Sequence, residues 1–408
     1  MIKQFNYITV RRFQSTIPKV QKEQDFEELL SNNKKLQELW TSPNPHHSIL
    51  EEQRHVSINC NESLPIILRN KAMVFKDVEI ENPGNKGAGL IVKQYVEFAK
   101  SIIKFYRVGI QNVWRNYKSV KLLREKYYIN DIDSKGADIK RRFKNSKDII
   151  MTLNNYLSLK KIEFEVLQNA GKIPNESIIN ISRYELSLLK RTELDYWKLP
   201  LFSLILLVCG ELTPFVVYVF PNLSPSTCVS PSILKSINSK NNLTFKQLRK
   251  PLNIFELNKN ELILYNKLYF LIPNFWTFLP KSYYQNNLTD HLNYLKLDDY
   301  YLTKKYYNKI NGLWLLSKNE LIKSCLDRNL IDLSTSDITK LRTNELRIKM
   351  LLYLGLENID FEHLQKIRQL ELKESNKLIN LRSSLVETVV IDDDSKELRH
   401  HHEGIKKG

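Results

Sequence analysis

A single carboxylate stands inside a long apolar run. Residues 199–220 contain Glu211 but no Lys, Arg, Asp or His. Burial away from water raises the pKa of a carboxylate, so such a group can take up and release protons near neutral pH. Pro214 removes a backbone donor and can free carbonyl groups to face a cation. Together with the preceding Asp195, these residues form a candidate proton or cation site.

The same residues have a simpler explanation. Glu211 could hydrogen-bond a neighbouring helix or pair with a basic residue such as Lys198 of a second copy. A single span cannot enclose an ion pathway, so transport would require a homo-oligomer or further membrane segments. The sequence leaves both interpretations open.

The element that carries Glu211 is predicted to be a transmembrane helix over 199–220. At the ordinary helical rise, this run is long enough to cross a hydrocarbon core of about 30 Å. Lys190, Arg191 and Lys198 precede it, and Pro221 with Asn222 follows it. A helical assembly factor that buries this run in a globular core is the alternative.

The composition favours a globular protein with an anionic partner. The chain has 408 residues, enough for two or three domains, and it carries 62 Lys and Arg against 45 Asp and Glu, a net charge of +17. Such an excess suits RNA or an anionic membrane surface. A basic chain is also common among proteins imported into mitochondria.

The first 22 residues resemble a mitochondrial targeting segment. They contain Lys3, Arg11, Arg12, Lys19 and Lys22, and no acid precedes Glu23. A basic amphipathic helix of this kind predicts a transit peptide over 1–16. Residues 17–90 have a weaker pattern and are predicted to be variable and partly disordered.

The remaining chain is predicted to be helical. Residues 91–198 form a basic amphipathic region whose apolar residues recur at three and four, so it could pack on another helix or lie on an anionic bilayer. Its bases are Lys93, Lys100, Lys104, Arg107, Arg115, Lys118 and Lys121. A helical domain over 221–360 and a polar helix and tail over 361–408 complete an all-α, membrane-anchored fold.

Residue patterns for enzymatic or metal chemistry are weak. The four cysteines are far apart and form no CxxC pair, and no hydrolytic or redox motif is recognisable. Residues 131–142 match half of a calcium loop, but Arg142 stands where a bidentate Glu is needed. They are predicted to form a polar turn between helices. We therefore expect no enzyme activity, no cofactor and no metal.

Several short motifs occur in one order between residues 181 and 227: ISRYE, KRTELD, KLPLF, then Glu211 and Pro214, then FPNLSPST. In this order they resemble the core of the LETM family, the leucine-zipper and EF-hand-containing transmembrane proteins of the mitochondrial inner membrane. The matching residues are Arg183, Glu185, Arg191, Thr192, Pro200, Phe220, Pro221, Asn222, Pro225, Ser226 and Thr227.

Residues 313–354 are similar to the ribosome-binding-like domain of that family. Glu320, Cys325 and neighbouring leucines fill its first-helix pattern. The resemblance implies candidate ribosome-binding residues at Arg328, Lys340, Arg342, Arg347 and Lys349.

The resemblance implies an inner-membrane protein with its C-terminal domain in the matrix. Its expected function is to bind mitochondrial ribosomes and support membrane insertion or translation of mitochondrially encoded proteins. The alternative is potassium/proton exchange, or its regulation, in mitochondrial ion homeostasis. Expected partners are ribosomal RNA or ribosomal proteins, inner-membrane lipids and a second copy of the chain.

Overall fold

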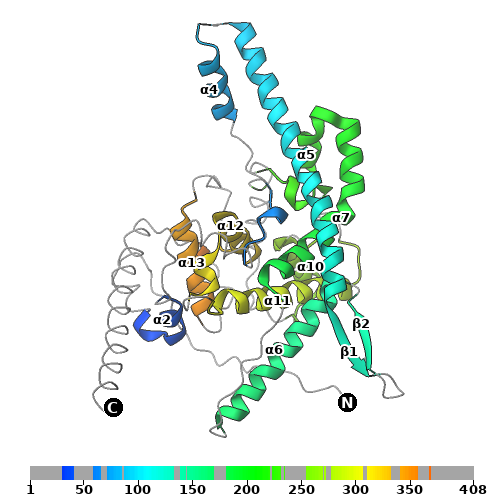
Figure 1. Cartoon of the computed structure of the whole chain (residues 1–408), viewed down its shortest axis with the longest axis vertical. Helices are drawn as coiled ribbons and strands as arrows, with labels where there is room; N and C mark the ends of the chain where they lie inside the picture. The colour runs from blue at the N-terminus through cyan, green and yellow to red at the C-terminus, as the bar shows by residue number, and fades with distance from the viewer. Residues whose placement is uncertain are drawn as a thin grey trace, which may run out of the picture.

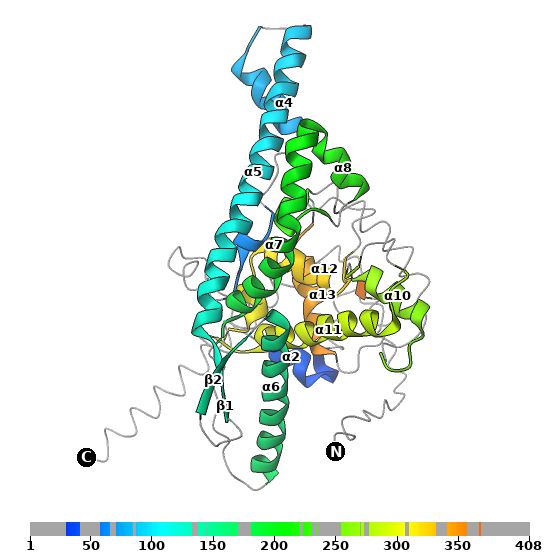
Figure 2. The ribbon, with the colours of Figure 1, turned by 90° about the vertical axis from the view of Figure 1, so that its right-hand side faces the viewer.

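The computed structural model describes residues 30–40, 58–65, 71–84, 87–132, 138–143, 145–169, 181–220, 223–230, 234, 254–269, 271–272, 277–306, 310–331, 341–356 and 367–368. In this part of the chain the fold is mostly helical, as predicted (Figures 1 and 2). The transit peptide expected at 1–16 and nearly all of the tail expected at 361–408 lie outside these residues.

The longest helix, α5 (Ala88–Lys126), runs along one side of the molecule. Its buried residues Phe105, Tyr106, Gly109, Val113 and Val120 recur at helical spacing and face the rest of the protein. The short helix α4 (Lys71–Glu81) lies beside its first turns, where the rings of Phe75 and Tyr95 are 5.2 Å apart. The first part of the amphipathic region predicted over 91–198 is thus one continuous helix, and the rest is divided among other elements.

A two-stranded antiparallel hairpin follows α5. Strand β1 (Tyr128–Ile132) pairs with β2 (Asp138–Arg142), with Tyr128 opposite Arg142 and Ile132 opposite Asp138. The sequence predicted only a polar turn here. Tyr128, Ile129 and Ile139 favour strands, and they explain why the chain pairs on both sides of the loop. Helix α6 (Ser146–Asn169) then extends away from the end of the molecule that carries α4 (Figure 1).

Helix α7 (Arg183–Cys209) packs on α5. It begins with a capping box, in which the Ser182 hydroxyl accepts from the Glu185 backbone and the Glu185 carboxylate accepts from the Ser182 backbone. It ends where Gly210 adopts a φ of 50°, a left-handed conformation that glycine tolerates best. A 3-10 turn, η3 (Gly210–Leu212), leads into the short helix α8 (Thr213–Val219).

The transmembrane helix predicted over 199–220 is therefore not formed. The run is divided between α7 and α8, and no described helix combines the length and apolarity needed to cross a membrane. The sequence contains both causes of the break. Gly210 stops α7, and Pro214 stands in the first turn of α8, where its missing N–H costs no hydrogen bond. Figure 2 shows α8 turning back from the end of α7.

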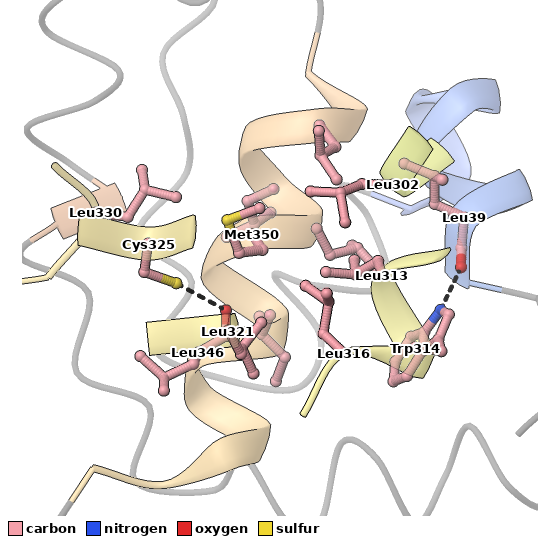
Figure 3. Close-up of a cluster of buried hydrophobic side chains, with 14 of the residues drawn as sticks. Leu39, Leu302, Leu313, Trp314, Leu316, Leu321, Cys325, Leu330, Leu346 and Met350 are labelled. Carbon is pink, nitrogen blue, oxygen red and sulfur yellow. Dashed lines mark hydrogen bonds between the residues drawn. The ribbon is translucent and has the colours of Figure 1, made fainter. Parts of the chain in front are cut away.

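The C-terminal helices form a compact body beside α7. It contains α10 (Lys259–Leu268), α11 (Lys281–Thr303), η7 (Gly312–Leu315), α12 (Lys318–Asp327) and α13 (Thr343–Gly355). The N-terminal helix α2 (Lys34–Trp40) completes its main core, in which the Trp314 indole donates to the Leu39 carbonyl at 2.9 Å (Figure 3). Two short 3-10 turns, η2 (Asn61–Ser63) and η5 (Ser226–Cys228), fill the junction with α5 and α7.

Candidate functional site

The second half of α7 presents a row of large apolar side chains to solvent. Leu194, Trp197, Leu201, Leu204 and Val208 recur at three and four residues, so they lie along one side of the helix. Their exposed fractions range from 48% to 79%. Side chains of this size are normally found inside a protein, and a contiguous exposed row of them marks an interaction surface.

The turn after α7 and the helix α8 extend this surface. Their exposed apolar residues are Leu212, Phe215, Tyr218 and Val219, with Leu207 near the end of α7 and Phe220 directly after α8. Val217 points the other way and is buried in a small cluster with Phe105, Tyr106, Phe202 and Cys228. We call residues 194–220 the apolar arm, because one side packs on α5 while the other remains open.

The exposed side of α5 carries two parallel stripes. Val92, Val96, Ile103 and Trp114 are exposed and are separated by 4, 7 and 11 residues, which places them on one apolar stripe. A neighbouring basic stripe has a similar helical spacing. It consists of Lys93, Lys100, Lys104, Arg107, Arg115 and Lys118, all exposed.

Four aromatic rings join α5 to the apolar arm. The rings of Tyr117 and Tyr196 stack face to face, with centroids 3.8 Å apart and an interplanar angle of 8°. Trp114 lies 6.2 Å from Tyr117 on one side, and Trp197 lies 6.4 Å from Tyr196 on the other. We call these four residues the aromatic ladder. It makes the apolar stripe of α5 and the exposed face of α7 one continuous surface.

The base of the arm is fixed by the polar motif that follows it. The Asp195 carboxylate accepts from the Ser226 backbone at 2.7 Å and from the Ser226 hydroxyl at 2.5 Å. The Thr227 hydroxyl donates to the Gly109 carbonyl at 3.1 Å. A Cβ at Gly109 would lie 2.6 Å from the Cys228 sulfur, so only glycine permits this close approach. Asp195 therefore orients η5 against α5.

A buried ionic network attaches α7 to the body. The Glu320 carboxylate of α12 accepts from Arg183 at 3.1 Å and from both terminal nitrogens of Arg191, at 2.6 and 3.0 Å. Arg183 also donates to Asp298 of α11 at 2.7 Å, and Arg328 donates to the second oxygen of Asp298 at 2.7 Å. All five side chains are buried, so α7, α11 and α12 are held at fixed positions.

The network keeps its carboxylates ionised. Burial by itself would raise the pKa of Asp298, but Arg183 and Arg328 outweigh it and hold this pKa well below its ordinary value. Burial likewise opposes ionisation of Glu320, and Arg191 and Arg183 lower its pKa overall. Each charge has a hydrogen-bonded counter-charge, which is the condition under which buried ions are tolerated. The arrangement is structural, with no group free to titrate near neutral pH.

One buried amine lies near this network without a counter-ion in direct contact. The Lys190 nitrogen has no hydrogen-bond partner in the described residues and lies 3.5 Å from the centroid of the Tyr294 ring. Burial lowers the pKa of Lys190 to about 7, against the opposing effect of Asp327. The neighbouring His291 is buried too, and its pKa is lowered to about 3.

The other motif residues are dispersed around the start of α7 and along the arm. Glu185 accepts from the Tyr127 hydroxyl at 2.8 Å, and Thr192 is buried. Pro200 lies inside α7, and Phe220 is exposed at the end of the arm. Pro225 precedes η5, whereas Pro221 and Asn222 lie outside the described residues.

The three residues of the proposed proton or cation site are in different settings. Asp195 binds η5, where burial raises its pKa. Glu211 stands in the η3 turn between α7 and α8, and its side chain is outside the described part of the structure. Pro214 is in the first turn of α8.

Most of the candidate ribosome-binding bases have internal partners. Arg328 belongs to the buried network, and the Lys349 amine donates to the Arg368 carbonyl at 3.2 Å. Arg347 is partly buried, with its guanidinium 5.9 Å from the centroid of the Trp314 ring. Arg342 is exposed at the start of α13, and Lys340 lies outside the described residues.

The sequence analysis missed the aromatic ladder and the open face of α7. A signal was present, since Trp197 and Leu194 interrupt the polar half of α7 at the spacing of the leucines that follow. In sequence, a row of apolar residues that is exposed looks the same as one that is buried. Only the packing of α5 against the opposite face shows that this row is left uncovered.

Comparison with known proteins relates the chain to a different family from the one expected from its motifs. Residues 58–306, more than half of the chain, match the family model described as the pentamidine resistance factor domain. A mitochondrial pentamidine resistance factor of Saccharomyces cerevisiae is 22% identical over an alignment of 303 positions, and the match covers 67% of this chain and 68% of that protein. No solved structure matches the chain significantly.

The proposed kinship with the LETM family was wrong. Its short motifs are explained by the packing of this fold: a capped helix start, arginines that bind buried carboxylates, and a Pro-Ser-Thr turn at Asp195. The match over residues 58–306 contains all of residues 181–227, the motif segment from which that kinship was inferred, whereas residues 313–354 lie beyond it. The chain belongs to the pentamidine resistance factor domain family.

Proposed function

We propose that this chain is a mitochondrial protein that binds the surface of the inner membrane through its apolar arm and holds its helical body there. The observation that carries the proposal is the continuous open row on α7 and α8, joined to α5 by the aromatic ladder. Apolar surface of this kind is stabilised when it leaves water, by about 25 cal/mol for each Å² buried.

The composition of the surface favours a lipid partner. Its apolar side chains are bordered by Trp114, Trp197 and Tyr196, and these residue types concentrate at the boundary between lipid and water. The basic stripe of α5 lies beside them, and anionic headgroups attract such bases. Apolar and aromatic side chains also suit a partner protein, but lysines are depleted at protein interfaces, so the basic stripe favours lipid.

The yeast relative supports the location and gives the wider role. That protein is named as mitochondrial and as a factor in pentamidine resistance. We propose the same location and the same contribution for this chain, and the basic segment over residues 1–22 agrees with import. The relative's name gives only the mitochondrion, and we add to it the proposal that the chain is attached to the inner membrane.

The proposal does not depend on ribosome binding or ion exchange. Ribosome binding stays a prediction, and the burial of Arg328 and Lys349 gives the bases chosen for it little support. Exchange was predicted from Glu211 inside a transmembrane helix, and the structure has a turn at that position. Binding to the membrane surface requires neither the candidate ribosome-binding bases nor Glu211.

Flotation with lipid vesicles tests the proposal directly. The purified chain is mixed with vesicles of phosphatidylcholine and phosphatidylglycerol and centrifuged through a density gradient. We expect the chain to float with the vesicles, and the triple variant Leu204→Gln, Leu207→Gln and Phe215→Gln to remain at the bottom. These side chains are already exposed, so the variant should fold as the wild type does.

Helix α6 offers a matched control. Leu159, Ile162 and Val166 are also exposed and apolar, but they lie on a helix that extends away from the arm (Figures 1 and 2). Their replacement by Gln should leave flotation unchanged. Equal loss in both variants, or no flotation of the wild type, would show that the arm is not a membrane-binding site.

The wider role can be tested in yeast that lacks the relative. Expression of this chain should restore growth in the presence of pentamidine, and the arm variant should not. Rescue by the arm variant at equal protein level would separate pentamidine resistance from membrane binding. A failure of the wild-type chain, correctly located in mitochondria, would contradict the shared role.

A further inference from the structure

The charges on α5 restrict how the arm can meet a bilayer. Figure 2 shows α5 and α4 extending past the turn between α7 and α8. If the arm entered the membrane end first, this part of α5 would enter with it, carrying Lys93, Lys100, Lys104 and Glu97 into the hydrocarbon core. Charged side chains are costly at that depth and rarely face lipid there.

The stripes of α5 run parallel to the helix axis, and this favours contact along its length. The apolar stripe from Val92 to Trp114 and the basic stripe beside it lie along the same exposed side. A helix with such a pattern rests in the plane of the interface, with its apolar side toward the acyl chains and its bases toward headgroups. Long basic side chains can reach outward from there to the phosphates.

The aromatic ladder marks one end of this contact, where the stripe of α5 ends and the arm begins. Trp114 and Trp197 are its exposed outer members, and the Lys118 amine lies 5.9 Å from the Trp114 ring centroid. Amphipathic rings with a cation beside them suit the headgroup region, where one side is apolar and the other is wet. The ladder also ties α5 to α7, so both helices must lie at the same depth.

We propose that the chain lies side-on on an anionic phospholipid bilayer, with the aromatic ladder at the boundary between headgroups and acyl chains, the basic stripe of α5 against lipid phosphates and the rest of the row on α7 against the outer part of the acyl chains. This orientation rests on the proposed membrane binding and adds to it a lipid class and a geometry. The axis of α5 then runs parallel to the membrane.

Depth-dependent fluorescence quenching tests the orientation. In a Trp114→Phe and Trp197→Phe background, one reporter at a time is placed by restoring Trp114 or Trp197, or by Val96→Trp or Leu204→Trp, and vesicles carry lipids brominated at a shallow or a deep acyl position. The signal of the background variant, which keeps Trp40, Trp276 and Trp314, is subtracted. Positions 96 and 114 are about 27 Å apart along α5 at 1.5 Å per residue. Side-on binding predicts shallow quenching at 96, 114, 197 and 204 alike.

End-first insertion gives a different result. A tryptophan at position 96 would then be quenched by the deep bromolipid and one at position 114 by the shallow bromolipid. The two positions would differ in depth by close to the full thickness of the hydrocarbon core. That gradient in a protein that still floats with vesicles would overturn the orientation and leave membrane binding intact. A wild-type chain that does not float at all would instead refute the proposed function.

Charge reversal tests the lipid class. The triple variant Lys104→Glu, Arg107→Glu and Lys118→Glu should bind vesicles that contain phosphatidylglycerol at least tenfold more weakly, and it should lose the salt dependence of the wild type. A matched variant, Lys259→Glu, Lys281→Glu and Lys318→Glu, makes the same charge change at exposed lysines of the body.

The matched variant should retain near wild-type binding. Equal weakening by both variants would show that net charge matters and the stripe does not, which would overturn the assignment of the phosphate contacts. Stable dimers formed through the arm in the absence of lipid would show that a second copy of the chain covers this surface. That result would also overturn the proposed contact with lipid.

Discussion

Leucines have opposite roles in the body and in the arm. In α13, Leu346, Leu351 and Leu352 are buried in the main core (Figure 3), whereas Leu204 and Leu207 of the arm are largely exposed. Both regions are rich in apolar residues, but only the body contains enough packed elements to cover them. The arm leaves its apolar side chains in solvent, where the proposed membrane contact would cover them.

The charges differ between the regions in the same way. The junction between α7 and the body buries Arg183, Arg191 and Arg328 and pairs each with a carboxylate. The exposed side of α5 leaves its bases in solvent, with few acids nearby, such as Glu97 beside Lys100. The junction thus uses arginine to fix helices to one another, whereas the basic stripe remains available to an external anion.

Removal of Glu320 should have the largest effect on the body. Glu320→Ala leaves Arg183 and Arg191 buried without their shared counter-charge, and such losses cost about 3–5 kcal/mol. Urea unfolding followed by circular dichroism measures the change. Glu125→Ala, at an exposed site on α5, should stay within about 0.5 kcal/mol. A loss below about 1 kcal/mol for Glu320→Ala would mean that the network does not hold the body together.

Closing the space at Gly109 should have an intermediate effect. Gly109→Ala places a Cβ against the Cys228 sulfur and the Thr227 carbonyl, and overpacking of this kind costs about 1–3 kcal/mol. We expect Cys228 to react faster with a thiol reagent, as measured by mass spectrometry of its peptide, because η5 must move from α5.

Gly89 provides the control for that substitution. It lies in the same helix, and a Cβ there would meet nothing within 4 Å. Gly89→Ala should leave the reactivity of Cys228 unchanged and stabilise the helix slightly. Unchanged reactivity in the Gly109 variant would show that the base of the arm is looser than its contacts imply.

Replacing Lys190 should have a smaller and opposite effect. Lys190→Met removes a buried amine that has no hydrogen-bond partner in the described structure, so we expect a gain of about 1 kcal/mol at pH 7. The folded pKa is about 7 and the unfolded pKa is near 10.4. Between these values the unfolded chain binds the extra proton, so wild-type stability rises with pH.

The advantage of Lys190→Met should therefore be largest at pH 7, fall as the pH rises and reverse toward pH 10, as followed by urea unfolding at several pH values. Lys121→Met, at an exposed position, should show no such trend. A gain that did not change with pH would mean that Lys190 stays protonated in the folded protein.

The helices were predictable because their causes are local. The spacing of apolar residues in α5 and the Ser182 with Glu185 cap of α7 are visible in the sequence. The break at Gly210 was also encoded locally, by a glycine and a proline close together, but the high hydropathy of the whole run concealed it. The transmembrane prediction was therefore wrong although its determinants were visible.

The site was harder to predict because it depends on distant partners. Arg183 meets Glu320 across 137 positions of the chain, and the pattern of either residue alone fits a surface charge equally well. The same is true of the aromatic ladder, in which Tyr117 and Tyr196 belong to different helices. Short motifs built from such residues resembled another family, while the pairing that explains them appears only in three dimensions.

The smallest effect on stability is expected in the arm itself. Leu207 is 82% exposed, so Leu207→Ala should change the free energy of unfolding by less than about 0.5 kcal/mol, whereas Leu351→Ala in the core should cost about 2–5 kcal/mol. The two variants remove the same atoms, and urea unfolding without lipid compares them directly. In a flotation assay performed on folded protein, Leu207→Ala should weaken vesicle binding more than Leu351→Ala does, because only Leu207 faces the membrane. A large loss of stability for Leu207→Ala without lipid would place this side chain in a packed interior and remove the basis for distinguishing the arm from the body.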